Sequence, residues 1–181
     1  MTTTATTTHI PAGTWSADPV HSSASFEVEH NGFSLFRTSF REFAAKLTSG
    51  DGEVGIHGTV PVESIDVTQP DFRAHLLSPE FFDSARYPNI EFSSSDLTFD
   101  GGEVTLRGEL TLAGKSKPVE ATGAFREAQT DAFGSDHMAL SLKATVDRHE
   151  YGIGWNMDLP NGKKVLGDDV TLLVELELVK E

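Results

Sequence analysis

The sequence predicts an all-β fold with one short helical insertion, organised as a closed eight-stranded antiparallel up-and-down barrel. Three observations lead to this prediction. Apolar and polar residues alternate with a period of two along most of the 181-residue chain. Short clusters of Gly, Asp and Asn separate the alternating runs. The helical spacers of a dozen or more residues that parallel strands require are mostly missing.

Each alternating run has one apolar face and one polar face, as expected of a strand that covers a core on one side and meets water on the other. About eight or nine such strands fit in the chain. The clearest runs are Ala24–Val28, Val54–Val62, Val104–Leu112, Met138–Val146 and Val170–Leu178. Three short turns suit antiparallel hairpins, at Gly50–Gly52, Asp100–Gly102 and Ala113–Lys115.

The parity of the apolar positions changes at three places, near residues 40–43, 62–65 and 92–97. Such a change indicates a bulge or a bend in the strand. Because a sheet needs bends to curl and close, these changes favour a barrel over a flat sandwich.

Residues 68–87 break the strand pattern. Pro70 and Asp71 suit the first turn of a helix, and Phe72 and Leu76 have helical spacing. The segment predicts a short helix or two whose apolar side chains must pack against the barrel.

The length of the chain fits a single domain. The threonine-rich residues 1–13 predict a disordered tail, and residues 14–181 predict the barrel domain. The N-terminus has neither the positive charge nor the apolar segment of a signal peptide. No stretch reaches the roughly 18 apolar residues of a membrane span. We therefore expect a cytoplasmic protein.

Composition excludes several function classes. The chain has 14 Lys and Arg against 28 Asp and Glu, a net charge of −14, which argues against binding to nucleic acid. It has no cysteine, so thiolate metal sites and thiol nucleophiles are excluded. Its seven histidines lack zinc-site spacing, and no serine-hydrolase or dinucleotide motif is present. The sequence predicts no catalytic residue, no metal site and no cofactor.

Phenylalanine stands out: ten of the twelve fall in two windows, residues 26–43 and 72–99. They indicate either an ordinary aromatic core or an apolar tunnel roofed by the helix, with few polar groups at its mouth. Small residues on the apolar faces of the strands indicate either a cavity or tight coiling of the strands. These small residues are Gly58, Gly108, Ala121, Gly123 and Ala144.

Several separated motifs resemble, in the right order, those of the YceI-like family of lipocalin-like polyisoprenoid-binding proteins. The motifs are Trp15–Ser22, Ser25–His30, Arg73–Asp83, Tyr87–Ser93, Gly108–Val119, Arg148–Ile153 and Leu166–Val170. The resemblance implies an extended eight-stranded barrel that holds a long amphiphile, such as an isoprenoid quinone, a polyprenyl phosphate or a fatty-acid derivative. Many members carry a signal peptide, whose features this chain lacks.

We therefore expect non-catalytic binding of a long-chain amphiphilic lipid in the barrel interior, for carriage, storage or sensing. Nine apolar residues are predicted to line the cavity: Phe26, Val28, Phe36, Phe40, Leu76, Phe81, Phe82, Phe92 and Trp155. Three donors are predicted to meet the polar head of the ligand: His21, His75 and Arg148.

Two other interpretations remain open at this point. A barrel enzyme, such as an isomerase or hydrolase acting on a hydrophobic substrate, would need a titratable pair in the cavity, for example His75 with an acid. A structural module with a solid core would have no cavity. The exposed hairpins of an antiparallel barrel also allow a homodimer.

Overall fold

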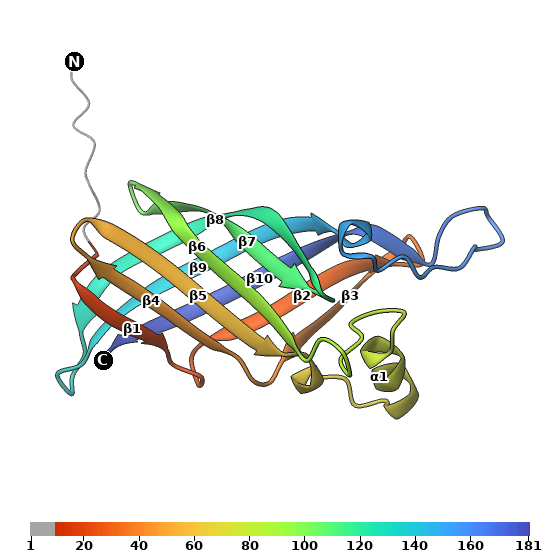
Figure 1. Ribbon diagram of the computed structural model, residues 1–181, viewed down its shortest axis with the longest axis horizontal. Helices are drawn as coiled ribbons and strands as arrows, with labels where there is room; N and C mark the ends of the chain where they lie inside the picture. The colour runs from red at the N-terminus through yellow and green to blue at the C-terminus, as the bar shows by residue number, and fades with distance from the viewer. Residues whose placement is uncertain (1–9) are drawn as a thin grey trace, which may run out of the picture.

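The computed structural model describes residues 10–181 and shows an elongated antiparallel barrel with a short helix at one end (Figure 1). The strands are β1 (Gly13–Ala17), β2 (Ser23–His30), β3 (Ser34–Phe40), β4 (Ala44–Gly50), β5 (Glu53–Pro61), β6 (Asn89–Asp100), β7 (Glu103–Leu112), β8 (Lys115–Thr130), β9 (Asp136–Asp147) and β10 (Leu166–Lys180). The helices are the 3₁₀ turns η1 (Val62–Ser64) and η2 (Arg148–Tyr151) and the α-helix α1 (Pro70–Leu77). Within residues 10–181, no helix is long and apolar enough to cross a membrane.

Ten strands occupy eight positions in the barrel wall. β1 and β2 both pair with the same edge of β10, β1 near its C-terminal end and β2 along the rest of it. β3 pairs with β2 and β4 pairs with β1, so these two strands also share one position. The remaining strands pair in chain order from β4 to β10, and the β1–β10 pairing closes the ring. The predicted closed eight-stranded antiparallel barrel is confirmed.

Each predicted change of parity has a structural cause. The change near residues 40–43 is the bend that separates β3 from β4. The change near residues 62–65 is the 3₁₀ turn η1. The third is a register shift in the β6–β7 ladder between Ser93 and Asp96. Because such irregularities bend a strand, they let the sheet close into a barrel.

The three predicted hairpin turns connect β4 to β5, β6 to β7 and β7 to β8. Each has two consecutive residues with positive φ, for example Asp51 at 53° and Gly52 at 83°. This backbone conformation matches the right-handed twist of paired strands. Ala113 also adopts it, with φ of 48°, although its Cβ disfavours that region.

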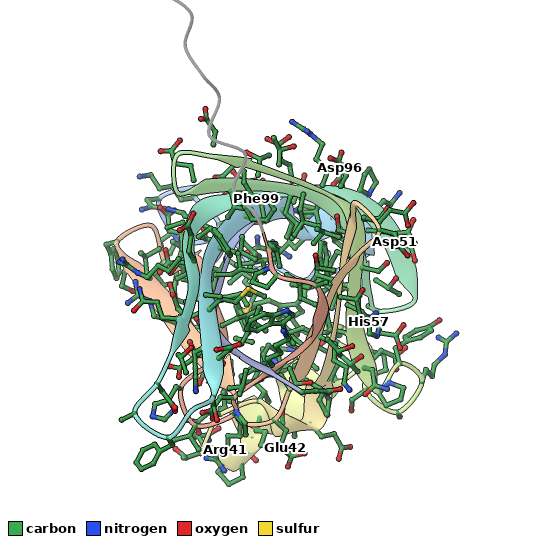
Figure 2. All side chains as sticks on the ribbon, turned by 90° about the vertical axis from the view of Figure 1, so that its left-hand side faces the viewer. Arg41, Glu42, Asp51, His57, Asp96 and Phe99 are labelled. Atoms are coloured by element: carbon green, nitrogen blue, oxygen red, sulfur yellow. The ribbon has the colours of Figure 1, made fainter. Side chains whose placement is uncertain are left out.

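One end of the barrel is filled with side chains. Trp15, Leu47, Leu140 and Leu178 are fully buried there. Figure 2 views the molecule from this end. We call it the closed end. Most of the predicted tail, residues 1–9, lies outside the described residues, but Ile10 is buried in this core, so the ordered chain begins before residue 14.

At the other end, the second edge of β3 finds no strand partner within residues 10–181 apart from one bridge, between Phe40 and Ile65. The segment after β5 takes the place of a neighbouring strand. Arg41 donates a backbone hydrogen bond of 2.8 Å to Ser64, and the Asp66 amide donates one of 2.8 Å to Ser39. α1 follows and lies beside this end, which we call the open end (Figure 1).

Candidate functional site

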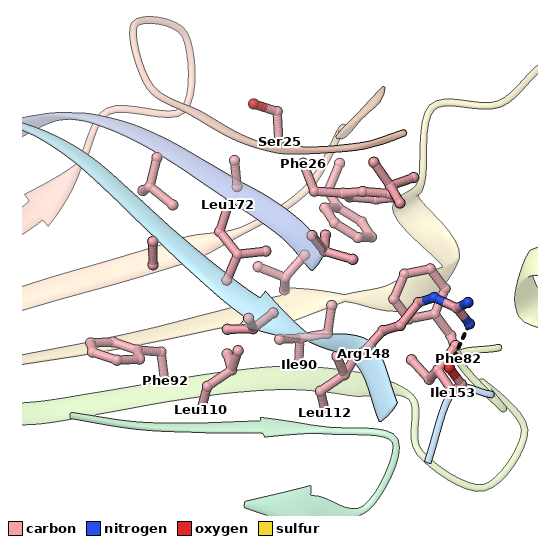
Figure 3. Close-up of a pocket in the computed structure, with 18 of the residues that line it drawn as sticks. Ser25, Phe26, Phe82, Ile90, Phe92, Leu110, Leu112, Arg148, Ile153 and Leu172 are labelled. Carbon is pink, nitrogen blue, oxygen red and sulfur yellow. Dashed lines mark hydrogen bonds between the residues drawn. The ribbon is translucent and has the colours of Figure 1, made fainter. Parts of the chain in front are cut away.

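The barrel encloses a cavity of about 780 Å³ that extends from its middle to the open end. This volume lies within the range of about 300–1,000 Å³ typical of small-molecule sites. Its wall is built from the inner faces of the strands and from α1, and Figure 3 shows part of it. In the part of the chain that the structure describes, none of the 28 acidic residues lines the cavity. A cavity of this size contradicts the interpretation of the protein as a module with a solid core.

The five small residues on the apolar faces divide into two groups. Gly58, Ala121 and Ala144 lie in the cavity wall, where their size leaves space. At Gly108 and Gly123 the neighbouring strand approaches closely instead. A Cβ at Gly108 would clash with the backbone oxygen of Ser93, and one at Gly123 would clash with the backbone oxygen of Ser141. Both interpretations of the small residues therefore hold, a cavity at three positions and close approach of strands at two.

All nine residues predicted to line the cavity lie in its wall. Phe26 is at the centre of an aromatic cluster, with its ring centroid 6.2 Å from Phe36, 5.9 Å from Phe40 and 6.1 Å from Phe82. The rings of this cluster meet edge to face or tilted, which is the favourable arrangement for aromatic side chains. The cluster joins β2 and β3 to the segment that follows α1.

The helix that carries part of this wall, α1, lies within residues 68–87, where the sequence predicts a short helix or two. The side chain of Gln69 caps its N-terminus by accepting a hydrogen bond from the amide of Phe72, and Pro70 occupies the first turn. The amide of Ser78 bonds to the His75 carbonyl and ends the helix. Leu76 is the buried residue of α1 and points into the cavity wall.

A second aromatic cluster surrounds His75 at the open end. The His75 ring lies edge to face with Phe81 at 4.9 Å and with Trp155 at 5.1 Å. Its Nε2 atom is 2.7 Å from Glu80 Oε2, and the Glu80 side chain is exposed to solvent. A histidine–carboxylate pair therefore lies at the mouth of the cavity, which the sequence spacing did not predict.

Arg148 lies in the cavity wall but directs most of its donors to the backbone. Nε donates to the Gly167 carbonyl at 2.7 Å, and Nη1 donates to the carbonyls of Ile153 at 2.7 Å (Figure 3) and Trp155 at 2.9 Å. Nη2 has no hydrogen-bond partner among the residues that the structure describes, and it lies 3.7 Å from Asp168 Oδ1. Burial lowers the pKa of Arg148, and the charge of Asp168 opposes this effect.

These contacts give Arg148 a structural part in the mouth of the cavity. Its guanidinium donates to two carbonyls of the segment after η2 and to one at the start of β10, and so holds the two segments together. The five N–H donors of arginine allow one side chain to bind all three acceptors. Tyr151, in η2, is also buried, and burial raises its pKa to about 12. The mouth on this side is therefore rigidly packed.

His21 does not lie at the cavity, so the predicted head-group set is corrected there. It belongs to the loop between β1 and β2, outside the residues that line the cavity, and it pairs with Asp18 at 2.9 Å. The hydrogen bond that His21 donates to Asp18 and the charges of Asp18 and Glu177 raise the pKa of His21. In the sequence, His21 lies near Pro19 at the start of a strand. That position does not reveal on which face of the barrel the His21 side chain lies.

Sequence reasoning missed two kinds of lining residue. Aliphatic residues from β6, β7, β9 and β10 form much of the wall, and their alternating pattern was visible but did not distinguish cavity wall from packed core. They include Ile90, Leu110, Leu112, Leu142, Val146 and Leu172. His30 and Ser34 also line the mouth, where β2 turns into β3.

The chain resembles known proteins in both sequence and fold. The model of the YceI-like domain matches residues 15–178, nearly the whole barrel. The chain belongs to the YceI-like family. Among curated YceI-like relatives, Protein YceI of Escherichia coli O157:H7 is 24% identical over 164 residues, which cover 89% of this chain and 83% of the relative. A UPF0312 protein of Photorhabdus laumondii is also 24% identical, over 89% of this chain and 82% of its own.

Solved structures show the same YceI-like fold. The crystal structure of BcnA from Burkholderia cenocepacia has a TM-score of 0.73 at 20% identity, and the match covers 91% of this chain and 99% of BcnA. A polyisoprenoid binding domain from Saccharophagus degradans, implicated in plant cell wall breakdown, has a TM-score of 0.68 at 11% identity. That match covers 92% of this chain and 98% of the domain.

Proposed function

We propose that the barrel binds a long-chain amphiphilic lipid, with its apolar chain in the cavity, and that it does so without catalysis. One observation carries the proposal: the cavity of about 780 Å³ has an almost wholly apolar wall. A polyisoprenoid is the favoured chain because a structural neighbour is a polyisoprenoid binding domain. An isoprenoid quinone and a fatty-acid derivative fit the same wall. Carriage, storage and sensing all require this binding step.

The affinity of such binding comes mainly from burial of the chain. Burying about ten methylene groups contributes about 8 kcal/mol, at ~0.8 kcal/mol each. This corresponds to roughly micromolar affinity before the cost of ordering the ligand. Polar groups are then needed only to hold the head.

The polar residues of the mouth suit a head group with acceptor atoms. His30 and Ser34 lie at the turn between β2 and β3, and His75 lies on α1. Imidazole and hydroxyl groups donate hydrogen bonds to phosphate, carboxylate or quinone oxygens. Since the donors of Arg148 mostly bind backbone carbonyls, His75 is the stronger of the two predicted head-group residues that reach the cavity.

Native mass spectrometry of freshly purified protein, followed by organic extraction, tests the proposal. We expect a stoichiometric adduct that releases an amphiphile with a long apolar chain. Phe82→Asp, which places a charge in the first aromatic cluster, should abolish retention of this lipid. Phe133→Asp is the matched control because Phe133 is exposed and lies outside the cavity wall.

A second variant separates loss of binding from loss of folding. Ala144→Phe adds volume to the wall of an existing cavity and introduces no charge. We expect a folded protein with reduced capacity for long chains. A folded Ala144→Phe or Phe82→Asp protein that retains the full lipid content would refute the proposed site.

The enzyme alternative rests on the pair of His75 and Glu80 at the mouth. Such a pair can move a proton at a bound substrate. His75→Gln distinguishes the two functions. Under the binding proposal, the lipid extracted from His75→Gln protein is chemically the same as that from the wild type. A substrate that accumulates unconverted only in the variant would favour the enzyme.

A further inference from the structure

The loop between β1 and β2 brings together three side chains that the proposed lipid site does not use. An imidazole nitrogen of His21, a carboxylate oxygen of Asp18 and one of Glu177 all lie within 4.8 Å of one another. Asp18 and His21 come from the loop, and Glu177 comes from the outward face of β10. One nitrogen and two anionic oxygens thus converge on the outer surface of the barrel.

The backbone of the loop is fixed to the strand that carries the third side chain. The Asp18 amide donates a hydrogen bond of 2.8 Å to the Glu177 carbonyl. The Glu177 amide donates one of 3.0 Å to Ser22 Oγ. Two anchors at the ends of the loop therefore set the distance between its side chains and β10 before any ligand binds.

Each carboxylate is also oriented from outside the trio. The Val20 amide donates to Asp18 Oδ1 at 2.8 Å, which leaves Oδ2 facing His21 Nδ1 at 2.9 Å. His137 Nδ1 lies 2.9 Å from Glu177 Oε1, and His137 Nε2 lies 3.1 Å from Asp131 Oδ2. Partners of this kind hold the ligands of metal sites in place and raise affinity.

We propose that Asp18, His21 and Glu177 form a binding site for Zn²⁺. An imidazole nitrogen with two carboxylates is a donor set that Zn²⁺ accepts, whereas Mg²⁺ and Ca²⁺ prefer oxygen donors alone. Two carboxylates balance the charge of a divalent cation. The contact between Asp18 and His21 can also be a simple ion pair, but an ion pair does not require Glu177 to converge on them.

The ion would connect two parts of the wall that the β1–β2 interruption separates. It would fasten the loop to β10 at the point where one strand position is divided between two strands. A ligand that binds only the folded state raises the melting temperature. Zn²⁺ should therefore stabilise the barrel without entering the lipid cavity.

Isothermal titration of the full chain with ZnCl₂ tests the site. We expect a single Zn²⁺ to bind per chain in a manner that millimolar Mg²⁺ does not reverse, and to raise the melting temperature. His21→Ala and Glu177→Gln should each weaken binding at least about tenfold, and His137→Ala should weaken it less. His57→Ala is the matched control, because His57 contacts Thr59 on β5 and belongs to no such cluster in the described part of the chain.

Equal Zn²⁺ affinity in the wild type and the His21→Ala protein would overturn the proposal, as would absence of binding in the wild type. If His21→Ala does not fold, Glu177→Gln decides, since it keeps the backbone anchors and removes one charge. The lipid content of the purified protein is independent of these results. Failure of the metal site and failure of the lipid site can therefore be told apart.

Discussion

The closed and open ends of the barrel share most of their strands but have opposite interiors. At the closed end, large side chains such as Trp15, Leu140 and Leu178 meet across the barrel and fill it. At the open end, aromatic rings lie against the wall and leave a cavity of about 780 Å³. Small barrels of about eight strands either fill with side chains or hold a ligand, and this one does both along a single axis.

This difference shows that the alternating pattern of a strand does not determine whether its inward side chains fill the barrel or border a cavity. Strand β9 alternates without interruption through both halves, yet Leu140 is fully buried and Leu142, two residues further, borders the cavity. The cavity is bordered at its mouth by residues of α1 and of the two aromatic clusters. It depends on small residues such as Ala144 at positions where a large side chain would reach the axis.

The largest contrast between the two ends is expected from Leu140→Ala and Leu142→Ala. Leu140→Ala creates a new void in a packed core and should destabilise the protein by about 4 kcal/mol. Leu142→Ala only enlarges an existing cavity, where the side chain has fewer contacts to lose, and should cost about 1–2 kcal/mol. Urea denaturation of both ligand-free variants measures the difference. Equal losses would mean that the open end is packed as densely as the closed one.

A smaller effect is expected from Arg148→Met, which tests whether the mouth is held rigidly. The change leaves the carbonyls of Ile153, Trp155 and Gly167 without their donor, and we expect a loss of about 2–3 kcal/mol. Hydrogen exchange followed by mass spectrometry should show faster exchange in residues 152–167. Arg86→Met is the control because Arg86 is exposed. Unchanged exchange in this segment would show that the guanidinium does not hold the mouth.

The smallest effect concerns Tyr151, the densely packed residue of the open end. Its pKa is raised to about 12 in the folded protein, compared with about 10 for an unfolded chain. The stabilising contribution of the neutral phenol is therefore complete below about pH 10 and is lost as the pH rises towards 12. We expect the urea midpoint of the wild type to fall more steeply between pH 10 and pH 12 than that of Tyr151→Phe.

Parallel curves for the two proteins would contradict this prediction. The comparison removes the titration of the remaining groups, since these are common to both proteins. The experiment thus reports on the burial of one phenol at the mouth.

Much of the fold follows from the sequence because each feature has a local cause. The period of two, the hairpin turns and the parity changes all have direct counterparts in β-ladders, turns and bends. Many of the lining residues were predictable for a related reason: large apolar residues of alternating strands favour the inner face, and apolar residues of the helical insertion must pack against the barrel. Eleven of the twelve predicted site residues accordingly lie in the cavity wall, His21 being the exception.

What the sequence could not supply is long-range geometry. The Glu177 side chain meets His21 only because β1 and β2 share the edge of β10, a pairing between opposite ends of the chain. The contact of His75 with Glu80 depends on the turn after α1, whose shape no spacing rule predicts. The role of Arg148 likewise depends on three carbonyls that only the folded loop presents.

The weakly paired edge of β3 has a consequence for where the barrel wall can open. Elsewhere in residues 10–181, neighbouring strands are joined by β-ladders, some of them with a register shift. β3 is instead joined to the segment after β5 by a bridge at Phe40 and a few hydrogen bonds, such as that from Thr38 Oγ1 to the Asp66 carbonyl at 2.8 Å. Each such bond contributes only about 1 kcal/mol. Local opening starts where the fewest bonds must break. The barrel therefore has a seam along β3, which is the place where we expect local opening of the wall to begin.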